Sequence, residues 1–67
     1  MKKDRFIKVY SQGVMAGSEI IVDRETGVNY LFHAAGYAGG LTPLLDAGGK
    51  PVISQDIVNE YKYRENV

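Results

Sequence analysis

Two runs of β-favouring residues flank the pentapeptide Asp23–Gly27, and this arrangement constrains the fold more than any other feature of the sequence. The runs are Ser18–Asp23, with three consecutive β-branched residues, and Val28–His33, in which alternate residues face opposite sides. An Asp that opens a short polar stretch and a Gly that closes it are typical of a hairpin built on a type I turn. The sequence therefore predicts an antiparallel hairpin in which Gly27 has a positive φ.

A further strand is predicted over Arg5–Ser11, where β-favouring residues alternate with a period of two. Strict alternation would place Phe6, Lys8 and Tyr10 on one face. The segment Gln12–Gly17 breaks the pattern with a glycine near each end, so we expect a turn there.

The second half of the chain begins with a segment of small residues, Ala34–Gly40, which we interpret as a glycine-rich loop. An edge strand is expected over Thr42–Asp46, because Pro43 cannot donate to a central ladder. Ala47–Pro51 reads as a turn, after which residues 51–53 would pair back on residues 44–45 as a short hairpin.

A helix over Gln55–Arg64 is predicted from the helical spacing of its apolar residues, with Ser54 as the N-cap. The fold class that follows is α+β: a small antiparallel sheet of three to five strands with two hairpins and one short C-terminal helix. We expect a single domain over residues 1–67, with a β-rich core at 5–53 and the helix at 54–65.

The chain has few means of stabilising itself. It has 67 residues, no cysteine and one histidine, so neither a disulfide nor a protein-only zinc site is expected. A chain near 60 residues buries only about 60% of its unfolded surface. Because 45% of its residues are hydrophobic, we expect a homo-oligomer, with two-fold symmetry as the default, to supply the missing burial.

Charge and hydropathy exclude several classes of partner. Eight basic and eight acidic residues give a net charge of zero, which argues against a nucleic-acid partner. No apolar run approaches the length of a membrane span, and the basic start is not followed by the apolar stretch of a signal peptide. We expect a cytoplasmic protein with no membrane partner.

Two stretches carry a resemblance to known proteins. The segment 20–32 (IIVDxETGVxYLF) and the segment 36–46 (GYAGGLTPLLD), followed by Gly49–Val52, resemble a family of short uncharacterised proteins of Gram-positive bacteria and their phages. The resemblance covers Arg5 to about Ile53. It implies no catalytic residue, and it implies a setting in which small phage proteins often bind something that the host made.

The glycine-rich segment is the best candidate site. Two consecutive glycines expose backbone amides that can cradle an anion. A tyrosine beside them could stack on a base, a threonine hydroxyl could donate, and a histidine and a turn lysine could contact phosphate. The alternative is a structural loop in which both glycines have positive φ and the tyrosine packs on the sheet. The candidate ligand-binding residues are Gly36, Tyr37, Gly39, Gly40, Thr42, His33 and Lys50.

Catalysis has less support in the sequence. Glu19 and Asp23 would share a face of their strand, but a turn cap at Asp23 and a solvated Glu19 explain them better than catalysis does. We therefore expect a non-enzymatic homo-oligomeric module without a cofactor or metal, which binds a phosphorylated or nucleotide-derived small molecule; in a phage it would sequester a signalling nucleotide. The alternative is a protein-interaction or structural module that uses its sheet edge or helix.

Overall fold

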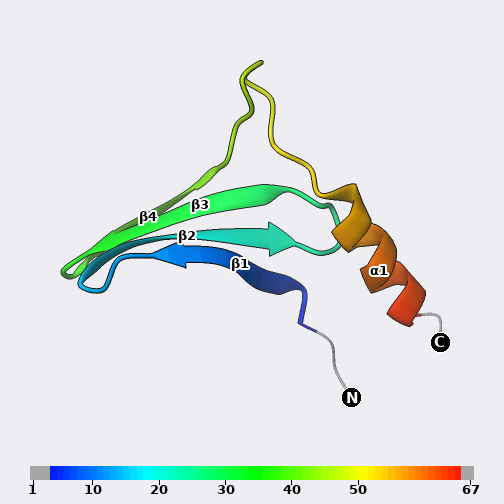
Figure 1. Cartoon of the computed structure of the whole chain (residues 1–67), viewed down its shortest axis with the longest axis horizontal. Helices are drawn as coiled ribbons and strands as arrows, with labels where there is room; N and C mark the ends of the chain where they lie inside the picture. Colours follow the sequence, from blue (N-terminus) through cyan, green and yellow to red (C-terminus); the bar gives the residue numbers. More distant parts are fainter. Residues whose placement is uncertain (1–3, 66–67) are drawn as a thin grey trace.

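The computed structural model describes residues 4–65 and has four strands and one helix (Figure 1). A single antiparallel sheet has the order β1-β2-β3-β4, so each strand pairs with its neighbour in the sequence. This confirms the α+β class with a small antiparallel sheet and one C-terminal helix. The elements are β1 (Phe6–Gln12), β2 (Ala16–Asp23), β3 (Asn29–Ala35), β4 (Ala38–Pro43) and α1 (Gln55–Glu65).

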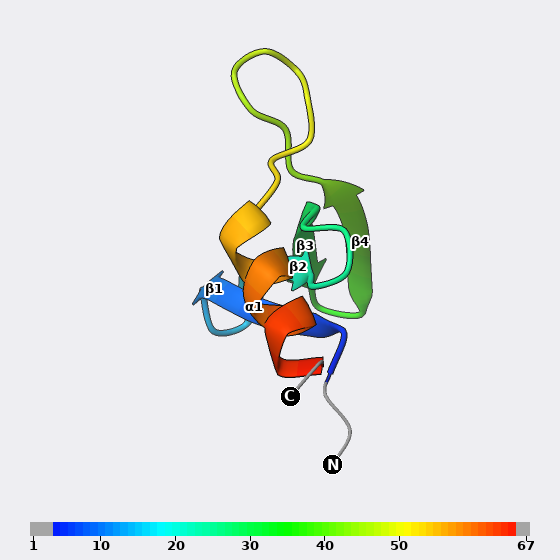
Figure 2. The same ribbon diagram turned by 90° about the vertical axis from the view of Figure 1, so that its right-hand side faces the viewer.

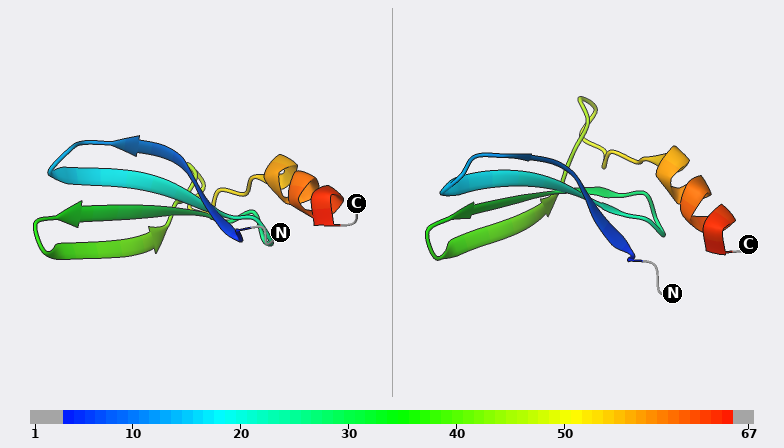
Figure 3. Two further views of the ribbon diagram at one scale, coloured as in Figure 1. Left: turned by 90° about the horizontal axis from the view of Figure 1, so that it is seen from below. Right: turned by 60° about the horizontal axis from the view of Figure 1, so that its bottom comes forward.

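The sheet forms a single layer. The chain measures 41 × 34 × 15 Å, and its shortest dimension is close to the thickness of one sheet with its side chains. Helix α1 stands beyond one end of the sheet and does not lie across either of its faces (Figures 2 and 3). The β1–β2 and β3–β4 turns lie together at the opposite end (Figure 1). No second layer therefore covers the sheet within residues 4–65.

The predicted turn between β2 and β3 is confirmed. The Gly27 amide donates to the Asp23 carbonyl at 2.7 Å, and the Glu25 amide donates to Asp23 Oδ1 at 2.9 Å. Gly27 has a φ of +82°, the left-handed conformation that a closing glycine takes at low cost. This turn sets the register of the hairpin, in which Ile21 lies opposite Tyr30.

Asp23 also ties β1 to the hairpin. Its carboxylate is buried and accepts hydrogen bonds from Arg5 Nε and Nη2, both at 2.9 Å. These hydrogen bonds, opposed by burial and aided by the amide of Glu25, lower the pKa of Asp23 from 3.8 to about 2. The Arg5 guanidinium lies 5.4 Å from the centre of the Phe6 ring. The charge on Asp23 therefore holds both the turn and the start of β1.

Asn29 connects the sheet to the C-terminal third of the chain. Its side-chain amide is buried and donates to the carbonyls of Gly27 and Val52 and to the hydroxyl of Ser54 at 3.0–3.2 Å. Residues 44–53, which we call the arm, project from the sheet (Figure 1). A bridge between Leu45 and Pro51 closes the arm, which confirms the short hairpin predicted there.

The buried apolar core is small. Val22, Val58 and Tyr61 are its members among the described residues. The guanidinium of Arg24 lies 4.7 Å from the centre of the Tyr61 ring, so α1 is held against the β2–β3 turn. The helix begins at Gln55 as predicted and ends at Glu65, one residue later than predicted.

The interpretation of Ala34–Gly40 as a loop is wrong. Ala34 and Ala35 end β3, Gly36 and Tyr37 form a two-residue turn, and β4 begins at Ala38 rather than at Thr42. Gly36 has a φ of +61° and Tyr37 does not have a positive φ, as in the turns that carry glycine at their first central position. Small residues have low β propensity, so their pairing depends on this turn and on neighbouring strands. Pro43 ends β4 at the sheet edge, where a missing amide is tolerated.

A β-bulge changes the faces predicted for the first strand. Lys8 lies opposite Ile21, but Tyr10 lies opposite Ile20, so Val9 is an extra residue in β1. Tyr10 therefore faces away from Phe6 and Lys8, contrary to the strict alternation expected from the sequence.

The register divides the side chains between two faces, because directly opposed residues of antiparallel strands point to the same side. The phenylalanine face comprises Phe6, Lys8, Ser11, Gly17, Glu19, Ile21, Asp23, Tyr30, Phe32, Ala34, Gly39, Leu41 and Pro43. The histidine face comprises Ile7, Tyr10, Gln12, Ala16, Ser18, Ile20, Val22, Asn29, Leu31, His33, Ala35, Ala38, Gly40 and Thr42.

The Gly27→Ala substitution should destabilise the chain more than Gly49→Ala. Both glycines have a φ near +80°, so both variants carry the left-handed strain of about 1 kcal/mol. A Cβ at Gly27 would also come within 2.8 Å of Val58 Cγ2, whereas one at Gly49 would meet nothing within 4 Å. Overpacking should add about 1 kcal/mol or more at Gly27. Urea unfolding of the two variants tests this. Equal losses of unfolding free energy would show that α1 shifts away from the new methyl group at no cost.

The Asp23 carboxylate should make the stability of the folded chain fall at acidic pH. Because its folded pKa of about 2 lies below the ordinary value of 3.8, its contribution is complete above about pH 4 and declines as the pH falls toward 2. Asp23→Asn should lose about 1.5–3 kcal/mol at pH 7, as expected for hydrogen bonds to a charged group, and should match the parent more closely at pH 2. Melting curves from pH 7 to pH 2 measure the difference, and a constant gap between the two proteins would contradict this role.

Candidate functional site

A row of three polar residues and one glycine crosses the histidine face from one edge of the sheet to the other. Gln12 of β1 lies opposite Ser18 of β2, Ser18 opposite His33 of β3, and His33 opposite Gly40 of β4. One residue from each strand therefore meets in a single line, which we call the polar row. The row lies near the end of the sheet that is remote from α1 (Figure 1).

Hydrogen bonds orient the side chains of the polar row. Ser18 Oγ and His33 Nδ1 share a hydrogen bond of 2.8 Å, which fixes the plane of the imidazole. The Tyr10 hydroxyl donates to Gln12 Oε1 at 2.7 Å, so the amide nitrogen of Gln12 remains the donor end of that side chain. The row thus presents an imidazole and a carboxamide beside the half-exposed ring of Tyr10.

A shallow hollow of about 280 Å³ lies at the β4 end of the row. His33 forms one side, and the other lining residues carry a methyl group or no side chain: Ala35, Ala38, Gly39 and Gly40. An edge strand leaves part of its backbone without a ladder partner, so main-chain groups of β4 are exposed there. The hollow therefore combines an imidazole with an accessible peptide backbone.

The two consecutive glycines have different roles. A Cβ at Gly39 would come within 3.3–3.4 Å of the Phe32 ring, so Gly39 makes room for an aromatic side chain on the phenylalanine face. A Cβ at Gly40 would meet nothing within 4 Å and would project over the histidine face. The expectation that both glycines adopt a positive φ in a structural loop is wrong, since the positive values belong to Gly13, Gly27, Gly36 and Gly49.

The structure brings together some of the predicted site residues and separates others. Thr42 shares the histidine face with His33 and Gly40. Gly36 and Tyr37 form the β3–β4 turn, where Tyr37 is fully exposed and does not line the hollow. Lys50 lies in the arm. Its amide and that of Gly48 both donate to Asp46 Oδ1, at 3.0 and 2.8 Å, so these amides already have an acceptor within the chain.

One protein-family model, described as a family of unknown function (DUF6440), matches residues 5–54. The chain belongs to the DUF6440 family. The match includes all four strands and the arm, and it stops at the residue before α1. Both sheet faces and the polar row are therefore within the DUF6440 region. No curated protein and no solved structure matches the chain.

The carboxylates of this DUF6440 chain do not form a catalytic or metal-binding pair. Glu19 and Asp23 share the phenylalanine face as predicted, but each has its own cation: Lys8 lies 3.7 Å from Glu19, and Arg5 lies 2.9 Å from Asp23. Within residues 4–65, no group of three or more His, Asp or Glu side chains could hold a metal ion. In the same range no helix has the length and apolar character needed to cross a membrane.

Sequence reasoning missed Tyr10, Gln12 and Ser18. Ser18 could have been found from the hairpin, because counting five residues outward from the Asp23–Val28 pair reaches Ser18 on one strand and His33 on the other. Tyr10 and Gln12 had no such signal, since the bulge at Val9 moves them to the histidine face. A bulge leaves no reliable mark in a single sequence.

Alanine substitutions should have different effects on stability at the two consecutive glycines of β4. Gly39→Ala should lower the free energy of unfolding by about 1 kcal/mol or more, because the Phe32 ring must move. Gly40→Ala should leave stability unchanged or raise it by about 0.4–1 kcal/mol, because the new methyl group meets open space and the unfolded chain loses freedom. Thermal and urea unfolding measure both variants. A larger loss at Gly40 than at Gly39 would contradict this assignment.

Proposed function

We propose that this DUF6440 chain is a non-enzymatic binding module of the cytoplasm that works as a homo-oligomer. Its ligand would be a small phosphorylated or nucleotide-derived molecule held on the histidine face. The observation that carries the proposal is the polar row, in which the register aligns Gln12, Ser18, His33 and Gly40 across four strands.

Three features of the row suit such a ligand. His33 is held through Nδ1 by Ser18, so Nε2 is the nitrogen that would meet an anion or a carbonyl. The half-exposed Tyr10 ring offers a face on which a base could stack, and the Gln12 amide beside it could read the edge of that base. Gly40 leaves room for a ligand to reach the backbone of the edge strand. In a phage, the same surface would serve to sequester a host signalling nucleotide.

The Ser18–His33 pair is the one feature that favours an enzyme, because a hydroxyl bonded to an imidazole is the start of a nucleophile arrangement. Such an arrangement also requires a third group that orients the base. Within residues 4–65, no carboxylate bonds the His33 ring, and Glu19, the acid next to Ser18, points to the other face. Binding therefore accounts for the geometry better than hydrolysis.

A thermal-shift screen of cyclic dinucleotides, ADP-ribose derivatives and mononucleotides should find at least one stabilising compound. A ligand at 100 times its Kd stabilises by about 2.7 kcal/mol. In a domain of this size each kcal/mol raises Tm by about 4–8 °C, so the shift should be roughly ten degrees or more. His33→Ala and Gly40→Ala should melt cooperatively and lose that shift, because they alter the row at exposed positions.

Lys50→Ala is the matched control, because Lys50 was a candidate from the sequence but lies in the arm. It should keep the full shift. Mass spectrometry of the recovered compound should show it unchanged, whereas a hydrolysed product would replace binding with catalysis. The proposal fails when no compound stabilises the parent, or when the shift survives His33→Ala and is lost in Lys50→Ala.

A second candidate function, docking on a protein partner, is favoured by the exposed tips of the sheet. Val14 and Met15 in the β1–β2 turn and Tyr37 in the β3–β4 turn are at least 90% exposed and lie at the same end of the sheet (Figure 1). Apolar side chains gathered in this way often mark an interaction site. Replacing Val14 and Met15 with serine should abolish capture of such a partner and leave the melting temperature and the ligand shift unchanged.

A further inference from the structure

The phenylalanine face has the form of an uncovered half-core. A hollow of about 420 Å³ is lined by Phe6, Ile21, Tyr30 and Leu41, all apolar or aromatic. Phe6 and Leu41 stand on the two edge strands and are 54% and 59% exposed. The face therefore has raised side chains at its edges and a depression at its centre.

A domain normally packs two layers around one core, because a sheet must bury its apolar face against another element. Here the chain is 15 Å thick, and three apolar residues are buried in the described part of it. From strand spacing and rise, the face covers roughly 20 by 23 Å. With side chains standing from it, its accessible area is of the same order as the ~800 Å² that each partner buries in a stable interface.

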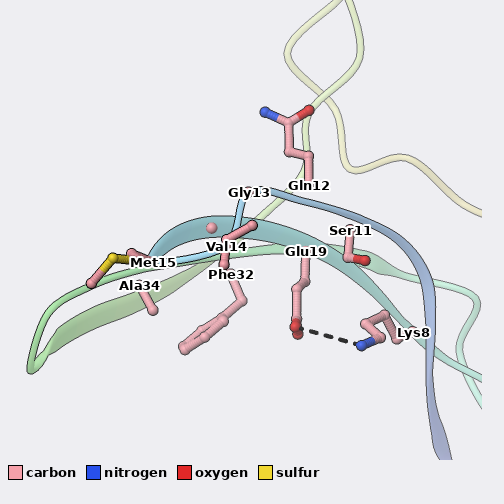
Figure 4. Close-up of a pocket in the computed structure, with 10 residues that line it drawn as sticks. Lys8, Ser11, Gln12, Gly13, Val14, Met15, Glu19, Phe32 and Ala34 are labelled. Carbon is pink, nitrogen blue, oxygen red and sulfur yellow. Dashed lines mark ion pairs between the residues drawn. The ribbon is translucent and has the colours of Figure 1, made fainter.

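The charges on this face identify what covers it. Lys8 and Glu19 lie side by side, with Nζ and Oε2 3.7 Å apart, next to a second hollow of about 310 Å³. Figure 4 shows both side chains on the same side of the sheet as Phe32, whereas Gln12 points to the other side. A partner of one sign, such as an anionic membrane, would repel one member of this pair. A copy of the same face, related by a two-fold axis that passes between Lys8 and Glu19, would place Lys8 of each chain against Glu19 of the other.

We infer that a second copy of this chain packs face to face on the phenylalanine face and supplies the missing layer. Phe6 and Leu41 of each copy fill the central depression of the other, and the two sheets lie about 10 Å apart, as in a β-sandwich. The net charge of zero gives the copies no overall repulsion. The inference rests on the proposed homo-oligomer and names its contact surface, while the polar row stays outside the interface on the opposite face.

Sedimentation and native mass spectrometry of the full chain at micromolar concentration should report twice the 7.4 kDa chain mass. Leu41→Glu should weaken the dimer by about 30-fold or more, because it places an unpaired carboxylate in the interface. Thr42→Glu is the matched control: it sits next to Leu41 on the same strand but on the histidine face, so it should keep the dimer.

A charge exchange keeps the inference testable where Leu41→Glu fails to fold. Lys8→Glu and Glu19→Lys each place like charges across the two-fold axis and should dimerise poorly alone. Mixed in equal amounts, they should form a heterodimer, because each then offers the charge that the other lacks. With one variant uniformly labelled with heavy nitrogen, native mass spectrometry distinguishes the two variants by mass and counts the mixed species.

Several outcomes would overturn the inference: a folded monomer at micromolar concentration, an oligomer that survives Leu41→Glu but not Thr42→Glu, or no preference for the heterodimer. The ligand proposal is separable from it. A dimer that fails to bind any nucleotide rejects ligand binding by the polar row and keeps the sandwich. A nucleotide shift in a folded monomer rejects the homo-oligomer and its sandwich and keeps the polar row.

Discussion

The single carboxylate of Asp23 holds the sheet in register. It accepts hydrogen bonds from the Glu25 amide inside the β2–β3 turn and from Nε and Nη2 of Arg5 just before β1, so the turn and the start of β1 meet at one buried charge. The turn closes on Gly27, whose missing side chain leaves space for Val58 of α1. In a sheet with a side-chain period of two, a slip of one residue would exchange the two faces. Asp23 therefore determines which side chains face which way.

The two faces differ in chemistry because of that register and of one bulge. Without the bulge at Val9, Tyr10 would stand with Phe6 and Lys8, and the polar row would lose its aromatic neighbour. With it, the phenylalanine face keeps apolar side chains beside the Lys8–Glu19 and Arg5–Asp23 pairs. The histidine face carries hydroxyl, imidazole and amide groups beside Ile20 and Leu31. A bulge near a sheet edge commonly redirects a side chain in this way.

Much of the fold followed from local signals in the sequence, and most of the candidate site did not. The Asp23–Gly27 hairpin, the helix start at Gln55 and the Leu45–Pro51 pairing each depend on residues close in sequence. The strand β4 was missed because alanine and glycine have low β propensity and pair only when a neighbouring strand presents its edge. The sequence suggested that His33 and Gly40 belong to one site, and the two residues lie opposite each other in the sheet. Lys50 was assigned to that site only because it lies in a turn, but the structure places it in the arm, away from the polar row.

A chain of this size must bury enough apolar surface to be stable and still leave a surface free for a ligand. The two different faces of the sheet offer one surface for each purpose. A four-stranded layer with its helix at one end has too little apolar burial of its own, yet a small protein that closes both faces keeps no surface for a ligand. The proposed face-to-face pair would satisfy both needs, since the phenylalanine faces would form the core and the two histidine faces would point outward. Such a dimer would carry two identical sites on opposite sides, and because neither site touches the interface, ligand binding would not have to open it. The stability of the pair and the occupancy of the row would then be separate properties of one sheet.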